Sequence, residues 1–180
     1  ASIGALAVCL NSWWTSEELE YGFTDSAAKL VFADAIQVRK LVPFAGRLGL
    51  QSVTVRSENT ERDPEFWEPI EVFSDVQLPT VDVQPDDDFA IMYTSGSSGF
   101  PKGVVMTHRG AISTIQSWLF GIKISARLGW SPAPMIDKKG KTFQPCSLVT
   151  VPFFHVSGTH PGILMSIWLG MKMVICHKWD

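Results

Sequence analysis

The chain has 180 residues, of which 46% are hydrophobic and 18% charged, a composition that supports a packed core and excludes an intrinsically disordered protein. Its formal net charge is −3 and no basic cluster occurs along it, so nucleic acid is not expected as a partner. Three widely spaced cysteines, without the spacing of a metal site, favour a reduced, cytoplasmic protein.

The first 56 residues alternate between the hydrophobic patterns of strands and helices. Residues 4–10 predict a short apolar strand, and Thr15 followed by Glu18 has the pattern of a helix capping box. The remaining elements of this part are strands at 30–33 and 52–55 and a helix at 35–48, which Pro43 should kink or shorten. This β-α-β-α-β order predicts an α/β fold of mostly parallel sheets flanked by helices.

Residues 57–88 interrupt this alternation. They are acidic, contain four prolines and end in three consecutive aspartates, so they predict a solvent-exposed connection. A short helix at 66–73 could dock Trp67 on the core.

From Phe89 the alternation resumes. A strand at 89–94 precedes a glycine-rich stretch and a second strand at 103–106, and Thr107 is expected to cap a helix that runs to about Leu119. A connection at 121–144 leads to the last elements, which are strands at 147–151 and 171–176 with a helix at 163–169 between them. The apolar residues 162–176 are too few to span a bilayer, which takes about 20, so no transmembrane segment is expected.

The stretch YTSGSSGFPKG, residues 93–103, has the composition of an anion-binding loop. Its three glycines permit positive φ and close approach to a ligand, and its hydroxyls stand beside backbone N–H groups. Lys102 adds a mobile positive charge, which a plain Gly-Ser connector does not need. A Walker A loop is excluded because Pro101 stands where that motif has its second glycine, and the Gly-x-Gly-x-x-Gly dinucleotide fingerprint is also absent.

Residues 91–103, IMYTSGSSGFPKG, closely resemble the AMP-binding signature of the adenylate-forming superfamily of acyl-CoA synthetases, peptide-synthetase adenylation domains and luciferases. The flanking DDDFA and GVVMTHRG resemble the family's acidic lead-in and its following strand and helix cap. Downstream, VPFFHVSG at 151–158 resembles the aromatic-histidine segment that lines the acyl pocket of acyl-CoA synthetases. The alternative for His155 is a histidine satisfied in a turn. His155 and His160 lie five apart without a Glu between them, so the zincin pattern is absent.

The resemblance implies a reaction in which a carboxylic acid is joined to AMP with release of pyrophosphate, and the acyl group then passes to a thiol. ATP, Mg²⁺ and CoA would take part. A carboxylate with a pKa of ~4.3 is already ionised at neutral pH, so the first step needs placement and charge stabilisation, not a general base. The residues implied to bind ATP are Thr94, Ser95, Gly96, Ser97, Ser98, Gly99, Lys102 and Gly103, with Lys102 as an electrostatic stabiliser and Thr94 in the Mg²⁺ shell. Those implied to bind the acid are His155, Val156, Ser157 and Gly158.

The segments that the family uses for adenine and ribose, and its C-terminal lid with a catalytic lysine, do not occur in these 180 residues. The resemblance therefore implies a partial AMP-binding N-terminal domain, in which 1–56 is the β-α-β-α-β part, 57–88 the acidic connection and 89–180 the glycine loop and acyl-pocket part. By itself this piece is expected to be inactive.

In the full protein we expect an acid–thiol ligase of the acyl-CoA synthetase type. It would act on a fatty or aryl acid in the cytoplasm, or at a membrane surface if the acid is a lipid. The alternatives are a carrier-protein-loading adenylation domain, a luciferase-like enzyme and a non-catalytic nucleotide-binding module.

Overall fold

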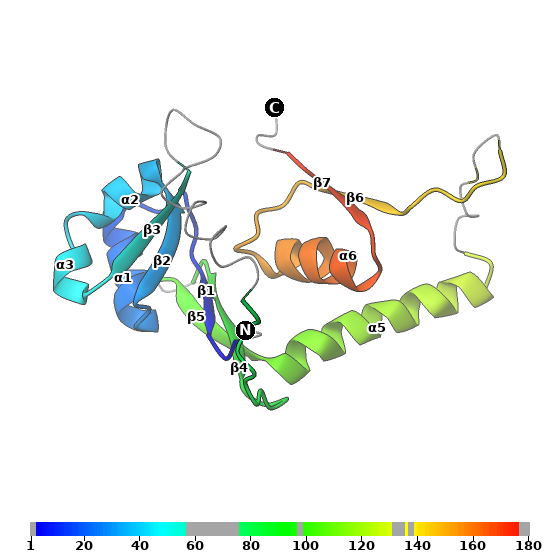
Figure 1. The fold of residues 1–180 in the computed structure, drawn as a ribbon, viewed down its shortest axis with the longest axis horizontal. Coiled ribbons are helices and arrows are strands. Elements are labelled where there is room, and N and C mark those ends of the chain that lie inside the picture. The colour runs from blue at the N-terminus through cyan, green and yellow to red at the C-terminus, as the bar shows by residue number, and fades with distance from the viewer. Residues whose placement is uncertain (1–2, 57–75, 97–98, 131–135, 137–138, 177–180) are drawn as a thin grey trace. The chain divides into compact units, whose positions relative to one another are not determined.

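The computed structural model describes residues 3–56, 76–96, 99–130, 136 and 139–176. The elements are β1 (Ala7–Cys9), α1 (Ser16–Ser26), β2 (Leu30–Asp34), α2 (Ala35–Leu41), α3 (Ala45–Leu48), β3 (Gln51–Arg56), β4 (Asp88–Thr94), β5 (Lys102–Thr107), α5 (His108–Arg127), β6 (Cys146–Val149), the π-helix η1 (Gly158–Leu164), α6 (Met165–Trp168) and β7 (Lys172–Ile175) (Figure 1). This order confirms the predicted α/β class. The expected helix at 66–73 lies outside the described residues.

The chain divides into two compact units. Unit 1 comprises Ala1–Val83 with Tyr93–Val104, and unit 2 comprises Gln84–Met92 with Val105–Asp180. Strands β1, β4 and β5 form a three-stranded sheet in that order, while β2 pairs with β3 and β6 pairs with β7. The three strands of the first 56 residues do not form one sheet, because β1 pairs with β4 while β2 and β3 form a separate parallel pair.

Helix α1 begins as its sequence predicts. The Thr15 hydroxyl accepts a hydrogen bond from the Glu18 N–H at 3.3 Å, and the Glu18 carboxylate accepts one from the Thr15 N–H at 2.7 Å. This reciprocal capping box satisfies two backbone donors that the first turn would otherwise leave free. The helix ends at Ala27, which has a left-handed φ of 53°.

The helix expected at 35–48 is divided in two. Asp34 caps α2 by accepting a hydrogen bond from the Gln37 N–H at 2.9 Å, and α2 ends at Leu41. Pro43 then interrupts the ladder, because proline has no N–H to donate and its ring crowds the preceding turn. The chain resumes helical geometry as α3, so the predicted break at Pro43 is confirmed.

The core of unit 1 lies where α1 meets the α2–α3 corner. Leu19 and Phe23, one turn apart on α1, pack with Leu41 and Phe44, and all four are buried. The parallel pair β2–β3 is aligned from Leu30↔Gln51 onward and lies beside these helices (Figure 1). Helix α1 is thereby anchored along one face.

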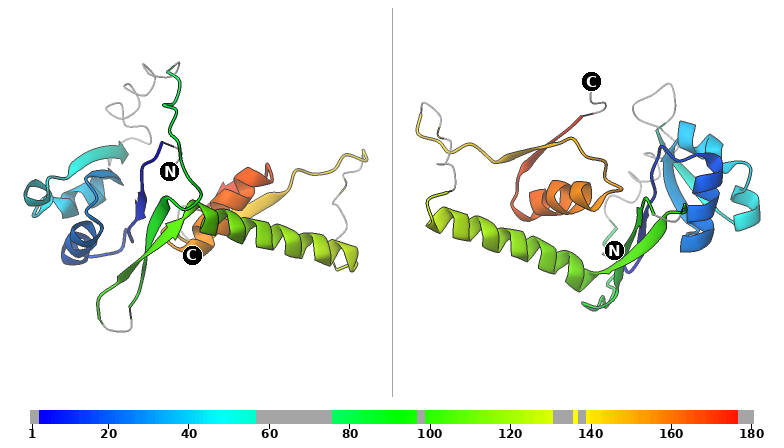
Figure 2. Two further views of the ribbon diagram at one scale, coloured as in Figure 1. Left: turned by 90° about the horizontal axis from the view of Figure 1, so that it is seen from below. Right: turned by 180° about the vertical axis from the view of Figure 1, so that it is seen from behind.

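Unit 2 contains the longest helix of the described chain, α5, which is continuous in every view of Figure 2. The Thr107 hydroxyl accepts a hydrogen bond from the Gly110 N–H at 3.1 Å, which confirms the predicted cap. The helix continues to Arg127, so the expectation of an end near Leu119 was wrong. Gly121 alone does not end the helix, because one glycine costs only about 1 kcal/mol in a helix interior.

The acidic run that precedes β4 contacts the start of α5. The Asp86 carboxylate accepts hydrogen bonds from the Arg109 guanidinium at 2.6 and 2.9 Å. The hydrogen bond from Arg109 lowers the pKa of Asp86. The carbonyls of Pro85 and Asp87 accept hydrogen bonds from the N–H groups of Arg109 and His108. Residues 85–87, at the end of the acidic run, therefore contact the first residues of α5 and are not only a solvated connection.

The second parallel pair, β6–β7, forms the C-terminal part of unit 2. Strands β6 and β7 align from Cys146↔Lys172 to Val149↔Ile175, and η1 and α6 connect them. The π-helix η1 contacts both β6 and α5, so it lies between the strands and the long helix (Figure 1). The helix expected at 163–169 therefore starts earlier and takes π geometry across Pro161.

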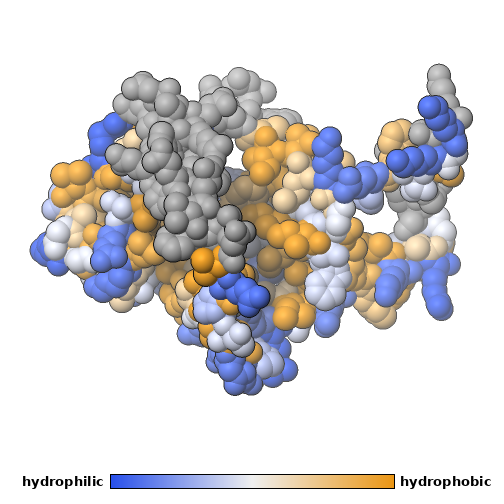
Figure 3. Space-filling view, viewed as in Figure 1, coloured by the Kyte–Doolittle hydropathy of each residue, from blue (hydrophilic) through white to orange (hydrophobic). Residues whose placement is uncertain are grey.

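Large hydrophobic side chains reach the surface, as the orange areas of Figure 3 show for one face. In unit 2 they include Leu148 of β6 and both Ile167 and Trp168 of α6. Among the described residues, no helix combines the length and hydrophobicity needed to span a lipid bilayer.

We expect Phe44→Ala to lower the free energy of unfolding by about 3–5 kcal/mol, because its ring is 1% exposed and its removal leaves a cavity. Val42→Ala is the control, since Val42 is 73% exposed and should change stability by less than about 0.5 kcal/mol. Urea unfolding of the full protein containing this chain measures both. Equal losses for the two variants would contradict the assigned core.

Candidate functional site

The glycine loop, residues 94–103, connects β4 to β5. Four consecutive residues of β4, Ala90 to Tyr93, are buried, and Thr94 at the end of the strand is exposed. A buried strand thus places a hydroxyl-bearing residue at the surface. Lys102 was expected in the loop and Gly103 at the start of the next strand. They are the first two residues of β5, and both are exposed.

Two of the three glycines have the backbone conformation that the sequence predicts. Gly96 has φ +60° and Gly99 has φ +101°, a region that L side chains rarely adopt. A Cβ at Gly96 would lie 2.1 Å from the Phe100 carbonyl oxygen, so no side chain fits there. Gly103 lies within β5 and has no positive φ, so the left-handed turn expected of it was wrong.

The polar groups of the loop face solvent. The Thr94 hydroxyl lies 3.5 Å from the Lys102 carbonyl oxygen, a long contact across the base of the loop. Thr94, Ser95 and Lys102 are exposed, whereas Ser97 and Ser98 lie outside the described residues. The structure therefore places the Thr94 hydroxyl near the backbone of Lys102, and the described polar side chains of the loop are exposed.

Helix α1 contacts both ends of this loop, which the sequence interpretation missed. Before the loop, the Tyr93 hydroxyl donates to Asp25 Oδ2 at 2.7 Å and lies 3.3 Å from the Gly22 carbonyl oxygen. Burial and the Asp25 carboxylate raise the pKa of Tyr93 far above its usual value, so the phenol remains a donor. At the far end, the Tyr21 hydroxyl donates to the Pro101 carbonyl at 3.0 Å. Tyr21 and Asp25 are four residues apart and share one helix face, but this spacing does not indicate a contact with residues 93 and 101.

The second group of predicted site residues, 155–158, belongs to unit 2 and forms a turn before η1. The His155 N–H donates to the Pro152 carbonyl at 3.1 Å, and the His155 carbonyl accepts from Gly158 and Thr159 at 3.0 Å each. A Cβ at Gly158 would lie 2.2 Å from the Pro152 carbonyl oxygen, so this buried glycine closes the turn.

The backbone of His155 is thus used by the turn, while its side chain and those of Val156 and Ser157 are exposed. The imidazole contacts the Phe154 ring at a centroid distance of 4.7 Å. The main chain of His155 takes part in the turn, while its imidazole is exposed beside the Phe154 ring, so its assignment to the acid site stays a prediction.

His160 differs from His155 in its environment. It is 2% exposed, and its Nδ1 atom is buried without a hydrogen-bond partner in the described part of the chain. Burial lowers the pKa of His160, while a hydrogen bond with the Val156 backbone opposes this shift. The Ser166 hydroxyl is also buried without a partner among the described residues. Within the described ranges, no group of three His, Cys, Asp or Glu side chains could hold a metal ion.

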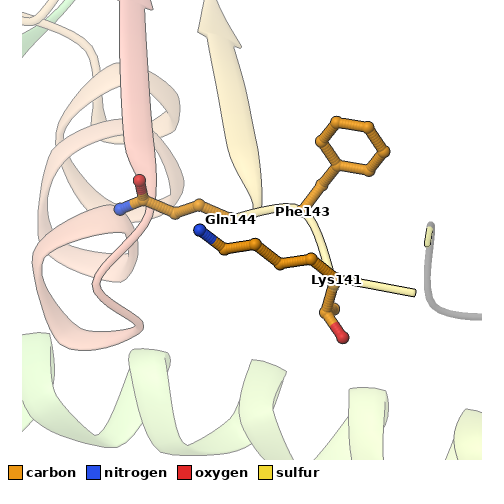
Figure 4. A pocket seen from close by; sticks show the side chains of 4 residues that line it. Lys141, Phe143 and Gln144 are labelled. Atoms are coloured by element: carbon orange, nitrogen blue, oxygen red, sulfur yellow. The ribbon is translucent and has the colours of Figure 1, made fainter. Parts of the chain in front are cut away.

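A separate hollow of about 410 Å³ lies on the connection between α5 and β6. It is lined by Lys141, Thr142, Phe143 and Gln144, and Figure 4 shows Lys141 and Gln144 extending to one side while Phe143 points away. The Gln144 side chain donates to the Gly170 carbonyl at 2.8 Å, which ties the connection to the β7 turn. None of the predicted site residues lines this hollow.

The sequence and the structure both match known proteins. The profile of the AMP-binding enzyme family matches residues 1–180, so the chain belongs to this family and the resemblance is confirmed. The chain is 26% identical over 181 residues to 4-coumarate-CoA ligase 1 of Narcissus pseudonarcissus and 29% identical over 181 residues to 4-coumarate–CoA ligase 3 of Oryza sativa subsp. japonica. These alignments cover 99% and 100% of the chain but 30% of each relative, so the chain spans about a third of their length.

Solved structures of the same fold include the inhibitor-bound N-terminal domain of FACL13 from Mycobacterium tuberculosis. It has a TM-score of 0.73 and 23% identity, covering 100% of this chain and 40% of that one. ATP-bound MatB from Rhodopseudomonas palustris has a TM-score of 0.66 and 21% identity, covering 95% of this chain and 30% of that one. These likenesses confirm the predicted fold, that of an adenylate-forming N-terminal domain.

We expect the stability of the protein to fall between about pH 6.5 and the lowered pKa of His160. The unfolded chain takes up a proton at its ordinary pKa of about 6.5, whereas the folded chain resists until lower pH, so acid favours unfolding. His160→Gln should remove this contribution, and the difference in urea midpoint between wild type and variant should shrink from pH 8 to pH 5.5. His155→Gln is the matched control, since its ring is exposed. A constant difference at all pH values would contradict the assignment.

Proposed function

We propose that the full protein containing this chain is an ATP-dependent acid–thiol ligase. It activates a carboxylic acid as an acyl-adenylate, releases pyrophosphate and transfers the acyl group to the thiol of CoA. The observation that carries the proposal is the glycine loop of an AMP-binding family chain, in which Gly96 and Gly99 have positive φ and the polar residues Thr94, Ser95 and Lys102 are exposed. The names of the relatives, which are CoA ligases, support the same reaction class.

The chain's own residues would act on the phosphates. Glycines without side chains let the backbone N–H groups approach phosphate oxygens, and the Thr94 and Ser95 hydroxyls donate beside them. Lys102, at the start of a paired strand, holds its charge near the departing pyrophosphate. The remaining residues assigned to this role are Ser97, Ser98 and Gly103.

Mg²⁺ would neutralise charge on the phosphates when bound. Mg²⁺ keeps several water ligands and binds mainly through substrate phosphates with few protein ligands. The exposed Thr94 hydroxyl is a fitting single protein contact, since the described residues hold no cluster of metal ligands.

The acid would lie against His155, Val156, Ser157 and Gly158, and its class is fatty or aryl. ATP and CoA place such an enzyme in the cytoplasm, or at a membrane surface for a lipid acid.

The reaction is tested by incubating the full protein with ATP, Mg²⁺, hydroxylamine and a panel of fatty and hydroxycinnamic acids. Hydroxamate formed only with ATP supports adenylation, and loss of free CoA thiol with the same acid supports transfer to CoA. Adenylation without use of CoA would favour a carrier-loading or luciferase-like enzyme. ATP binding without hydroxamate would favour a nucleotide-binding module.

We expect Lys102→Ala to lower kcat/KM for ATP in pyrophosphate exchange by about 10- to 100-fold, because a charge-assisted contact contributes about 1.5–3 kcal/mol. Lys102→Arg should retain part of the activity, since it keeps the charge. Lys123→Ala removes another exposed lysine, on α5, and is the control. An unchanged rate for Lys102→Ala at subsaturating ATP would rule out this role.

We expect His155→Ala to raise KM for the acid more than KM for ATP, because its exposed ring is free to face the acid. Its backbone hydrogen bonds in the turn do not depend on the side chain, so the melting temperature should change little. Steady-state kinetics and thermal unfolding on one preparation separate binding from a structural role. A lower melting temperature with unchanged kinetics would assign His155 to the turn alone.

A further inference from the structure

Helix α1 holds the glycine loop at both of its ends. The two contacts come from one helix face, since Tyr21 and Asp25 are four residues apart. All of the residues concerned belong to unit 1.

The contact before the loop fixes the end of β4. Tyr93 is buried, its hydroxyl donates to Asp25 at 2.7 Å, and its ring packs edge-on against Trp14 at a centroid distance of 5.5 Å. A Cβ at Gly22 would lie 2.9 Å from the Trp14 ring, so the helix backbone approaches closely. The position of Tyr93 sets where Thr94 enters the loop.

The contact after the loop fixes the residues that lead into β5. The Tyr21 hydroxyl donates to the Pro101 carbonyl at 3.0 Å, and its ring packs on Phe100 at a centroid distance of 5.2 Å. The Phe100 side chain is otherwise 65% exposed. Tyr21 therefore contacts both residues that precede Lys102.

The exit of the loop is coupled to its first glycine. The Phe100 carbonyl oxygen lies where a Cβ of Gly96 would stand, so the two peptide segments are in direct contact. A shift of Phe100 must displace Gly96, the glycine beside Thr94 and Ser95. The Tyr21 contact thus acts on the part of the loop that faces a bound anion.

The position of helix α1 is fixed by its packing in the core and by its N-terminal cap. Leu19 and Phe23 anchor it in the core of unit 1, and its first turn is closed by the capping box. Tyr21 lies two residues after Leu19 and two before Phe23. At 3.6 residues per turn, two residues correspond to a rotation of about 200°, so Tyr21 projects from the opposite side of α1. One face of α1 is buried in the core while another face holds the loop.

We propose that Tyr21 and Asp25 are positioning residues that hold the glycine loop in the conformation that binds the nucleotide phosphates. This inference rests on the proposed function, because the loop must bind ATP for its positioning to matter. Neither side chain belongs to the loop itself. They act through Phe100 and Pro101 at one end of the loop and through Tyr93 at the other.

The experiment uses the full protein with Tyr21→Phe, which keeps the ring and removes the donor, and Tyr21→Leu, which removes both contacts. We expect the dissociation constant and KM for ATP to rise about 2- to 10-fold in Tyr21→Phe and about 5- to 50-fold in Tyr21→Leu. KM for the acid should stay within about 2-fold. Asp25→Ala should resemble Tyr21→Leu, and Asp25→Asn, which keeps an acceptor for Tyr93, should recover most of the affinity.

Two controls separate positioning from general stability. Glu20→Gln removes the ion pair with Arg47 on α3 from the same helix without touching the loop. Phe23→Leu weakens the core beneath α1. Both should leave KM for ATP within about 2-fold, although Phe23→Leu lowers the urea midpoint. If Phe23→Leu raises KM for ATP as much as Tyr21→Leu does at equal loss of stability, the proposal is overturned.

Amide hydrogen exchange of the nucleotide-free protein tests the contact independently of activity. Exchange in residues 95–103 should accelerate at least about 5-fold in Tyr21→Leu and remain unchanged in Glu20→Gln. Unchanged exchange in Tyr21→Leu would overturn the inference even if the enzyme is active. A wild-type protein that neither binds ATP nor forms hydroxamate would instead overturn the proposed function, while exchange still reports whether α1 holds the loop.

Discussion

The glycine loop depends on the close contact between the Phe100 carbonyl oxygen and the backbone of Gly96. The 2.1 Å between that oxygen and an added Cβ excludes every side chain at position 96. The contact brings the exit of the loop back over its entrance, so that Thr94 and Lys102 lie at its base. A loop closed in this way has fewer conformations to lose on binding a polyphosphate than an open Gly-Ser connector would have.

The surrounding structure supports this closure from two directions. Strand β4 is buried over four consecutive residues and ends in Thr94, which is exposed. The strand therefore places Thr94 at the surface. Helix α1 is held by its apolar face, leaving its tyrosine and aspartate to contact the loop. One helix of 11 residues thus packs in the core with one face and contacts the glycine loop with another.

In unit 2, the backbone and the side chain of His155 have different roles. In the turn before η1, Gly158 and the His155 main chain build the geometry, and the His155 imidazole remains exposed. Five residues later, His160 is buried, and its Nδ1 atom has no partner among the described residues; a buried polar group costs free energy unless it is hydrogen-bonded. Two histidines on one segment thus have opposite environments, which their spacing in the sequence does not reveal.

The sequence by itself determined the local features whose causes lie within a few residues. These are the capping box at Thr15, the cap at Thr107, the break at Pro43, the alternation of strands and helices and the need for glycine at positions 96 and 99. Each follows from backbone sterics or from short-range hydrogen bonds. The AMP-binding signature likewise lies in one continuous stretch, which is why the family could be recognised.

Only the tertiary structure decided which distant segments meet. Pairing of β1 with β4 instead of β2 and the burial of His160 depend on packing between residues far apart in the chain. The contact of Tyr21 with Pro101 joins residues 80 positions apart, and no local pattern encodes it. Long-range contacts are selected by the sum of burial and hydrogen bonding over the whole fold, so a single strand or helix does not specify its partner.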